Sequence, residues 1–193
     1  IKQPFLFIPM SHAIKTAIIW AGIYMAIEIG IVLAGYNHDP NVHVIAFGVN
    51  TLCLLLAVGV SIVSNFNKKK HEGVSIVIDL KTGIKTSAIY ALTIASFVLI
   101  YYKWIDPEYP EIRRQQWIAA TETKQFSEDV DKKIVDNPDM FYGKSSEDIR
   151  DNEQEGINML LNPNNVFLMT LLALLVLGMF YSFLITGFNR LVL

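Results

Sequence analysis

The residues with the chemistry to form a site are a few polar side chains inside otherwise apolar runs. Glu28 is the one carboxylate of the first run, and it lies about 10 Å below the outer end of that run at 1.5 Å per residue. Near the same depth are Asn50 in the second run, Thr170 in the fourth, and Ser96 and Tyr101 in the third. We therefore expect a layer of hydrogen-bonding groups around Glu28.

Two hypotheses account for a carboxylate at this depth. A charged side chain in mid-bilayer costs about 2.5–3.5 kcal/mol, so Glu28 requires either protonation or a partner. Ionisable residues within membrane helices commonly carry function, which favours a carboxylate that senses a proton or a ligand. The alternative is a structural side chain that holds neighbouring helices together by hydrogen bonds. The sequence leaves both hypotheses open.

Catalytic and cofactor motifs are absent from the sequence. It contains no Gly-rich phosphate loop, no nucleophile elbow and no paired His or Cys motif. The four histidines are scattered, although His38 and His43 could form a weak metal site with Asp39. We therefore expect no catalytic residue, no cofactor and no metal, and an intramembrane enzyme is the least expected class of function.

Four apolar runs must position these polar side chains. They cover residues 14–35, 44–64, 84–105 and 166–189, and each is long enough for the roughly 20 residues that cross a bilayer core of about 30 Å. Hydrophobic residues make up 52% of the 193, which indicates a single membrane domain over residues 1–193. The predicted fold class is all-α, a polytopic membrane protein with four transmembrane helices.

Small residues recur at every fourth position of the first run, at Gly22, Ala26, Gly30 and Ala34. Lipid gives helices no hydrophobic reason to associate, so close backbone contact along small residues is a main route to helix packing. This stripe centres almost opposite Glu28 on a helix. We expect the first helix to contact neighbours on both faces, unless these residues reflect only the abundance of Gly and Ala in membrane helices.

Basic residues are concentrated on one side of the runs, although Lys103 lies at the other end of the third run. They lie near the amino terminus, in the region 66–85 and at the carboxyl end, as Lys2, Lys15, Lys68, Lys69, Lys70, Lys81, Lys85 and Arg190. The loop 36–43 has none. Because short positive segments stay in the cytoplasm, both termini and the middle loop are predicted to be cytoplasmic. The loop 36–43 and the segment 106–165 are then outside.

Two short segments are predicted to lie in the membrane interface. Residues 1–9 contain two prolines and two phenylalanines, which indicates an interfacial arm, or an extension before a start at Met10. Residues 74–83 are too short to span and mix apolar residues with Asp79 and Lys81. This mixture favours a separate interfacial helix before the third run.

The segment 106–165 is the one large hydrophilic part of the chain. It contains 14 acidic and 7 basic residues, so its net charge is −7. Helices are predicted over 108–126 and 145–161, the second capped by Ser145 or Ser146. We therefore expect a helical, extracytoplasmic insertion between the third and fourth helices. Its acidity favours a protein partner or cations over nucleic acid.

Parts of the chain also resemble a known family. The similar stretches are 73–76 (GVSI), 85–87 (KTS), 101–108 (YYKWIDPE) and 178–185 (GMFYSFLI). They resemble domain-of-unknown-function family 4199, uncharacterised four-span bacterial membrane proteins, and the similarity extends over residues 11–190. The resemblance implies four helices and a bacterial inner-membrane location, and it supplies no activity or catalytic residues. The segment 106–165 is longer than is usual in the family.

These observations predict a non-enzymatic integral membrane protein. Its expected partners are the lipid bilayer and other membrane protein subunits or a second copy of itself, with no nucleic acid. The first hypothesis is an accessory or scaffold subunit that packs against another membrane protein. The alternative is a small transporter or proton-coupled channel that uses Glu28.

Overall fold

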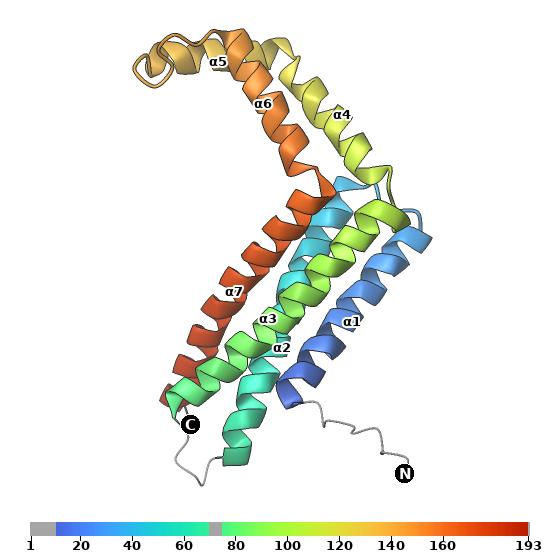
Figure 1. The fold of residues 1–193 in the computed structure, drawn as a ribbon, viewed down its shortest axis with the longest axis vertical. Coiled ribbons are helices and arrows are strands. Elements are labelled where there is room, and N and C mark those ends of the chain that lie inside the picture. Colours follow the sequence, from blue (N-terminus) through green and yellow to red (C-terminus); the bar gives the residue numbers. More distant parts are fainter. Residues whose placement is uncertain (1–10, 70–74, 193) are drawn as a thin grey trace, which may run out of the picture. The chain divides into compact units, whose positions relative to one another are not determined.

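The computed structural model describes residues 11–69 and 75–192, and all regular secondary structure in this part of the chain is helical (Figure 1). The helices are α1 (His12–Leu33), α2 (Pro40–Lys69), α3 (Ile76–Ile100), the short π-helix η2 (Tyr101–Ile105), α4 (Tyr109–Thr121), α5 (Lys124–Asp136), α6 (Ser146–Leu160) and α7 (Pro163–Val192). The all-α fold class is confirmed. The interfacial arm predicted for residues 1–9 falls outside the described residues.

The contacts divide the chain into two compact units, each described here by itself. Among the described residues, the four-helix unit comprises 11–69, 75–97 and 169–192, and the polar unit comprises 98–168. In the four-helix unit α1 packs against α2, and α3 contacts both α2 and α7. Four helical segments, α1, α2, α3 with η2, and α7, are long and apolar enough to cross a membrane.

The four-helix unit turns many large apolar side chains outward and buries several polar ones. Leu33 is 83% exposed, and Val44 and Phe188 are also among the exposed side chains. The buried positions hold Leu54, Tyr90 and Ile94, and also the fully buried polar residues Ser61, Asp79, Thr86, Ser87 and Ser182. Such an apolar exterior is unfavourable in water but matches a lipid surround, where only the polar groups must be satisfied internally.

The beginning of α3 differs from the sequence prediction. Residues from Ile76 onward form the first turns of one continuous helix that ends at Ile100, so the separate interfacial helix predicted for 74–83 is wrong. The prediction rested on the mixture of apolar residues with Asp79 and Lys81, which is typical of a segment in the membrane interface. In the structure Asp79 is 0% exposed, because a partner from α7 neutralises it within the helix bundle.

The hairpin between α1 and α2 is shorter than predicted. Gly35 has a φ of +77°, a left-handed conformation that glycine adopts without strain, and it ends the first helix. Helix α2 then begins at Pro40, where proline fits the first helical turn. The Oδ1 atom of Asp39 accepts a hydrogen bond from the Asn41 amide at 2.8 Å, which satisfies one of the open donors at the start of the helix.

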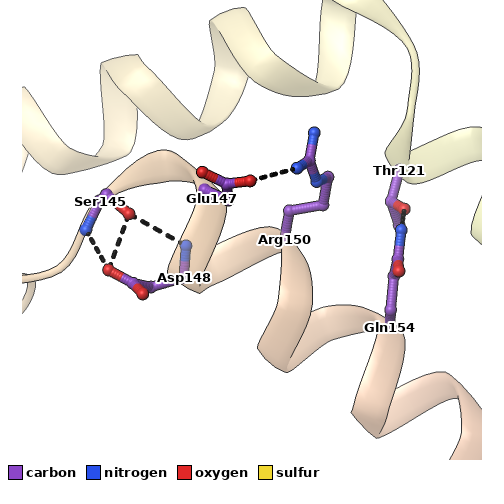
Figure 2. Close-up of polar contacts among 6 residues, drawn as sticks. All are labelled: Thr121, Ser145, Glu147, Asp148, Arg150 and Gln154. Carbon is purple, nitrogen blue, oxygen red and sulfur yellow. Dashed lines mark hydrogen bonds and ion pairs between the residues drawn. The ribbon is translucent and has the colours of Figure 1, made fainter.

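In the polar unit, α4 and α5 each pack against α6. The Nε2 atom of Gln154 donates to the Oγ1 atom of Thr121 at 3.0 Å and joins α6 to α4 (Figure 2). The hydroxyl of Ser146 donates to Asp131 and joins α6 to α5. Val130 and Ile157 are the buried apolar side chains of α5 and α6. The unit therefore combines a small apolar contact with polar links between its helices.

Ser145 caps α6, as predicted. Its Oγ accepts from the Asp148 amide at 3.1 Å, while its own amide donates to Asp148 Oδ2 at 2.8 Å (Figure 2). These reciprocal bonds form a capping box. The predicted helix 108–126 is instead split between α4 and α5, because the Oγ1 atom of Thr123 accepts from the Phe126 amide and begins a new helix.

Asp106 lies between η2 and α4, within the polar unit. Its amide donates to the Tyr101 carbonyl at 2.9 Å and closes the π-helical turn. Its Oδ1 atom accepts from the Tyr109 amide at 3.2 Å, at the start of α4. Asp106 therefore ends η2 with its backbone amide and accepts a hydrogen bond from the start of α4 with its side chain.

Candidate functional site

The most unusual feature of the four-helix unit is a buried ion pair between α3 and α7. The Oδ2 atom of Asp79 lies 3.0 Å from the Nη2 atom of Arg190. Its Oδ1 atom accepts a second hydrogen bond from the Nδ2 atom of Asn65 on α2, at 2.9 Å. Three helices therefore meet at one carboxylate, and each of its oxygens has a donor.

The ends of the helices favour this pair electrostatically. Asp79 lies in the first turn of α3, where the helix dipole favours a negative charge, and Arg190 lies in the last turn of α7, where it favours a positive one. The guanidinium carbon of Arg190 is also 5.2 Å from the centroid of the Phe66 ring, a cation–π distance. The arginine side chain remains 30% exposed, so the pair has one buried and one partly solvated member.

Glycine and serine residues bring α3 and α7 into close contact beside this pair. A Cβ added to Gly83 would lie 2.8 Å from the Cβ of Ser182, and one added to Gly178 would lie 2.4 Å from the Cβ of Ser87. The two contacts are reciprocal, because Gly and Ser are four residues apart on each helix and the helices are antiparallel. Small residues at this spacing let helix backbones approach closely in a membrane.

The two serines satisfy their hydroxyls within their own helices. Ser87 Oγ donates to the Gly83 carbonyl at 2.9 Å, and Ser182 Oγ donates to the Gly178 carbonyl at 2.7 Å. The contact between α3 and α7 therefore buries polar atoms without leaving these two hydroxyls unpaired.

Further polar groups extend the buried set along α2, α3 and α7. The hydroxyls of Thr86 and Ser61 are hydrogen-bonded at 2.8 Å. On α7, the Oγ1 atom of Thr186 and the Nδ2 atom of Asn189 are buried without a hydrogen-bond partner among the described residues. We call Ser61, Asn65, Asp79, Thr86, Thr186, Asn189 and Arg190 the polar seam.

The predicted residues around Glu28 have partners of their own. Glu28 is 8% exposed, and its carboxylate accepts a hydrogen bond from the Tyr24 hydroxyl one turn earlier in α1. Asn50 Oδ1 accepts from the Tyr90 hydroxyl at 2.8 Å, which links α2 to α3. The carboxyl of Glu28 is therefore sheltered by a side chain of its own helix.

The other three members of the predicted layer are Ser96, Tyr101 and Thr170, and Ser96 is half-buried on α3. Tyr101 belongs to the polar unit, where its hydroxyl donates to Asp106 Oδ2 at 3.4 Å. Thr170 is half-buried on α7. In the outer hairpin, the Nε2 atom of His43 lies 2.5 Å from the Asn37 carbonyl oxygen. No three His, Cys, Asp or Glu side chains converge as metal ligands within residues 11–69 and 75–192.

The small-residue stripe of α1 lies on the outside of the chain. Ala26, Gly30 and Ala34 are exposed and Gly22 is half-buried, and a Cβ added to either glycine would meet no atom within 4 Å. The buried small residues of α1 are instead Ala13, Ala17 and Ala21. Packing of the predicted stripe therefore requires a second molecule and stays a prediction.

Sequence reasoning missed the pair of Asp79 and Arg190, although a signal was available. The two residues lie near the ends of successive apolar segments that are predicted to be at the same side of the membrane, with opposite charges. The glycine–serine spacing recurs in both segments, at 83 and 87 and at 178 and 182. Together these patterns indicate an antiparallel pair of helices with a charge pair at one end.

Four long apolar helices with an apolar exterior and a buried polar seam define a multi-pass helical membrane protein. The chain belongs to DUF4199, a family of proteins of unknown function, which it matches over residues 15–190. The resemblance found in the sequence is thereby confirmed. Comparisons with curated proteins and with solved structures found no match.

Proposed function

We propose that this protein is a non-enzymatic accessory or scaffold subunit that packs against another membrane protein. The outer face of α1, with Gly22, Ala26, Gly30 and Ala34, is the proposed contact surface. We further propose a bacterial inner-membrane location with both termini in the cytoplasm, based on the distribution of basic residues. In this orientation the segment 106–165 is outside.

The observation that carries the proposal is the openness of the α1 stripe. A Cβ at Gly22 or Gly30 would meet no atom of the described chain, so a partner helix has room for close backbone contact. This protein already uses small residues four apart for that purpose at Gly83 and Ser87. A second stripe with the same spacing and no internal neighbour is therefore suited to an external helix.

The polar unit supports the same proposal. Its acidic side chains outnumber the basic ones two to one over residues 106–165, and many of them are exposed, including Asp139 and Glu153. Such a surface attracts a basic partner surface and repels an anionic one. A protein partner outside the membrane fits this charge better than a nucleic acid.

Purification in mild detergent followed by mass spectrometry tests the proposal. The wild-type chain is expected to carry a stoichiometric membrane-protein partner, or a second copy of itself. Gly30→Leu fills the stripe and is expected to lose the partner. Ile29→Leu, at a neighbouring exposed position, is the matched control and should retain it. A wild-type chain that purifies as a clean monomer would contradict the proposal.

A second candidate function is a small transporter or proton-coupled channel. It is favoured by two buried carboxylates, Glu28 and Asp79, in helices that are apolar enough to span a membrane. Glu28→Gln is expected to abolish a pH-dependent flux in proteoliposomes while the helical content stays unchanged. If the wild-type chain shows no pH-dependent flux and Glu28→Gln only unfolds the chain, the carboxyl is structural.

A further inference from the structure

A pocket of about 300 Å³ lies within the four-helix unit, between the first turn of α1, the last turns of α2 and the first turns of α3. Its lining includes Ser11, Ala13, Asn65, Lys81 and Lys85. All of these residues belong to one compact unit. The pocket is separate from the layer predicted around Glu28 and from the α1 stripe.

Two lysines give the pocket a positive charge. Lys81 and Lys85 are four residues apart on α3, so their side chains lie on the same face, and a bound anion would relieve the repulsion between their like charges. Neither lysine forms an ion pair with a residue in the described part of the chain. Asp79, the carboxylate closest to them in sequence, is already bonded to Asn65 and Arg190.

The first turn of α1 adds hydrogen-bond donors to the same pocket. The first backbone bonds of this helix run from Ile14 and Lys15 to the Ser11 carbonyl, so the amides of His12 and Ala13 have no partner within the helix. The side chain of Ser11 makes no capping hydrogen bond. Unpaired amides at a helix start favour an anion, and phosphate in particular.

We infer that this pocket binds a phosphate group, held by Lys81 and Lys85 and by the first amides of α1. The pocket lies at the ends of three membrane-crossing helices, which is the level of the lipid headgroups. Basic pockets between transmembrane helices bind anionic headgroups. An anionic phospholipid is therefore the expected source of the phosphate, and a free phosphate compound shares the same chemistry.

Native mass spectrometry of the full chain in detergent tests the inference. The probes are phosphatidylglycerol and a diacylglycerol with the same acyl chains but no phosphate. The wild-type chain should retain phosphatidylglycerol and not diacylglycerol. Lys81→Gln with Lys85→Gln should weaken that retention about 25-fold, since each lysine near the surface contributes on the order of fivefold. Lys15→Gln removes an exposed lysine of α1 that does not line the pocket, and should change retention less than twofold.

The source of the phosphate is distinguished by competition. If millimolar inorganic phosphate leaves the phosphatidylglycerol adduct intact, a lipid headgroup is the ligand. If it displaces the lipid from the wild-type chain, the pocket binds phosphate, and a soluble phosphate compound is its ligand. Equal retention by the wild type and the double variant overturns the inference. An equal loss in Lys15→Gln also overturns it, because that result shows only general attraction of a positive surface to anionic lipid.

Discussion

Asp79 and Arg190 form an ion pair at 3.0 Å although 111 residues separate them in the chain. The pair fixes the register of two antiparallel helices, because Asp79 occurs one turn before Gly83 and Arg190 occurs two turns after Ser182. With the ion pair formed, each glycine faces the serine of the other helix. A one-residue shift would place side chains against backbones that now approach within van der Waals distance. The charges and the small residues therefore specify the same packing.

Removing one member of the pair should destabilise the fold strongly. Asp79→Asn leaves Arg190 without its carboxylate, and breaking a buried ion pair costs about 3 kcal/mol when one partner is partly solvated. Unfolding in mixed micelles measures the change in the free energy of unfolding. Asp79→Asn with Arg190→Gln should recover part of the loss, since no unpaired charge remains.

The control for this prediction is an exposed ion pair. Arg150 and Glu147 are one turn apart on α6 at 3.4 Å (Figure 2), and Arg150→Gln should change the free energy of unfolding by less than about 0.5 kcal/mol. If Asp79→Asn costs no more than Arg150→Gln, the buried pair does not stabilise the fold.

The close contact of α3 and α7 predicts a sharp difference between two glycines of one helix. Gly178→Ala puts a methyl group 2.4 Å from the Cβ of Ser87, which forces the helices apart at a cost of about 1–3 kcal/mol. Gly187→Ala meets no atom within 4 Å and should be neutral or slightly stabilising, because alanine is the better helix former. Thermal unfolding in detergent compares the two variants. Equal melting temperatures would show that the contact tolerates an added methyl group.

Composition and run length were enough to predict the four apolar helices and the acidic helical insertion, since a span requires a minimum number of apolar residues. They were not enough to place the first turns of α3. A charge near the end of an apolar run has the same local sequence whether it is solvated or paired across the bundle. Only its partner on α7, far along the chain, distinguishes the two cases for Asp79.

The same boundary concealed the glycine–serine contact. The third run was predicted to begin at residue 84, which separated Gly83 from Ser87 and broke their four-residue spacing. The stripe at Gly22 and Gly30 lies wholly within one run and was found, although it has no partner inside the chain. Spacing within one helix identifies a surface suited to close packing, and it does not identify the helix that packs there.

The capping box of α6 predicts a pH-dependent helix start. The amide of Ser145, and then its hydroxyl, donate to the Asp148 carboxylate and hold its pKa below the ordinary value. A lowered pKa stabilises the folded form above the ordinary carboxyl pKa of about 3.9. That contribution is lost as the pH falls through the lowered pKa of the folded state. The first turn of α6 should therefore loosen only in acid.

Ser145→Ala tests this relationship. It removes the hydroxyl bonds but leaves the amide bond, so the pKa of Asp148 should rise part of the way to its ordinary value. Titration of the Asp148 carboxyl by NMR measures the change. Ser146→Ala is the matched control, because that hydroxyl bonds to Asp131 of α5 and should leave the Asp148 pKa where it is. An unchanged Asp148 pKa in Ser145→Ala would show that the Ser145 hydroxyl does not cause the shift.

The proposed orientation predicts opposite labelling of two exposed positions. Asp139→Cys lies in the acidic segment and Asn67→Cys lies near the end of α2, and both native side chains are exposed. Cys53, the one native cysteine, is 4% exposed and should stay silent. A membrane-impermeant maleimide should label Asp139→Cys on intact spheroplasts, and Asn67→Cys only after lysis. One membrane-crossing segment, α3 with η2, lies between Asn67 and Asp139 in the chain. Labelling of both positions from the same side would therefore contradict the orientation.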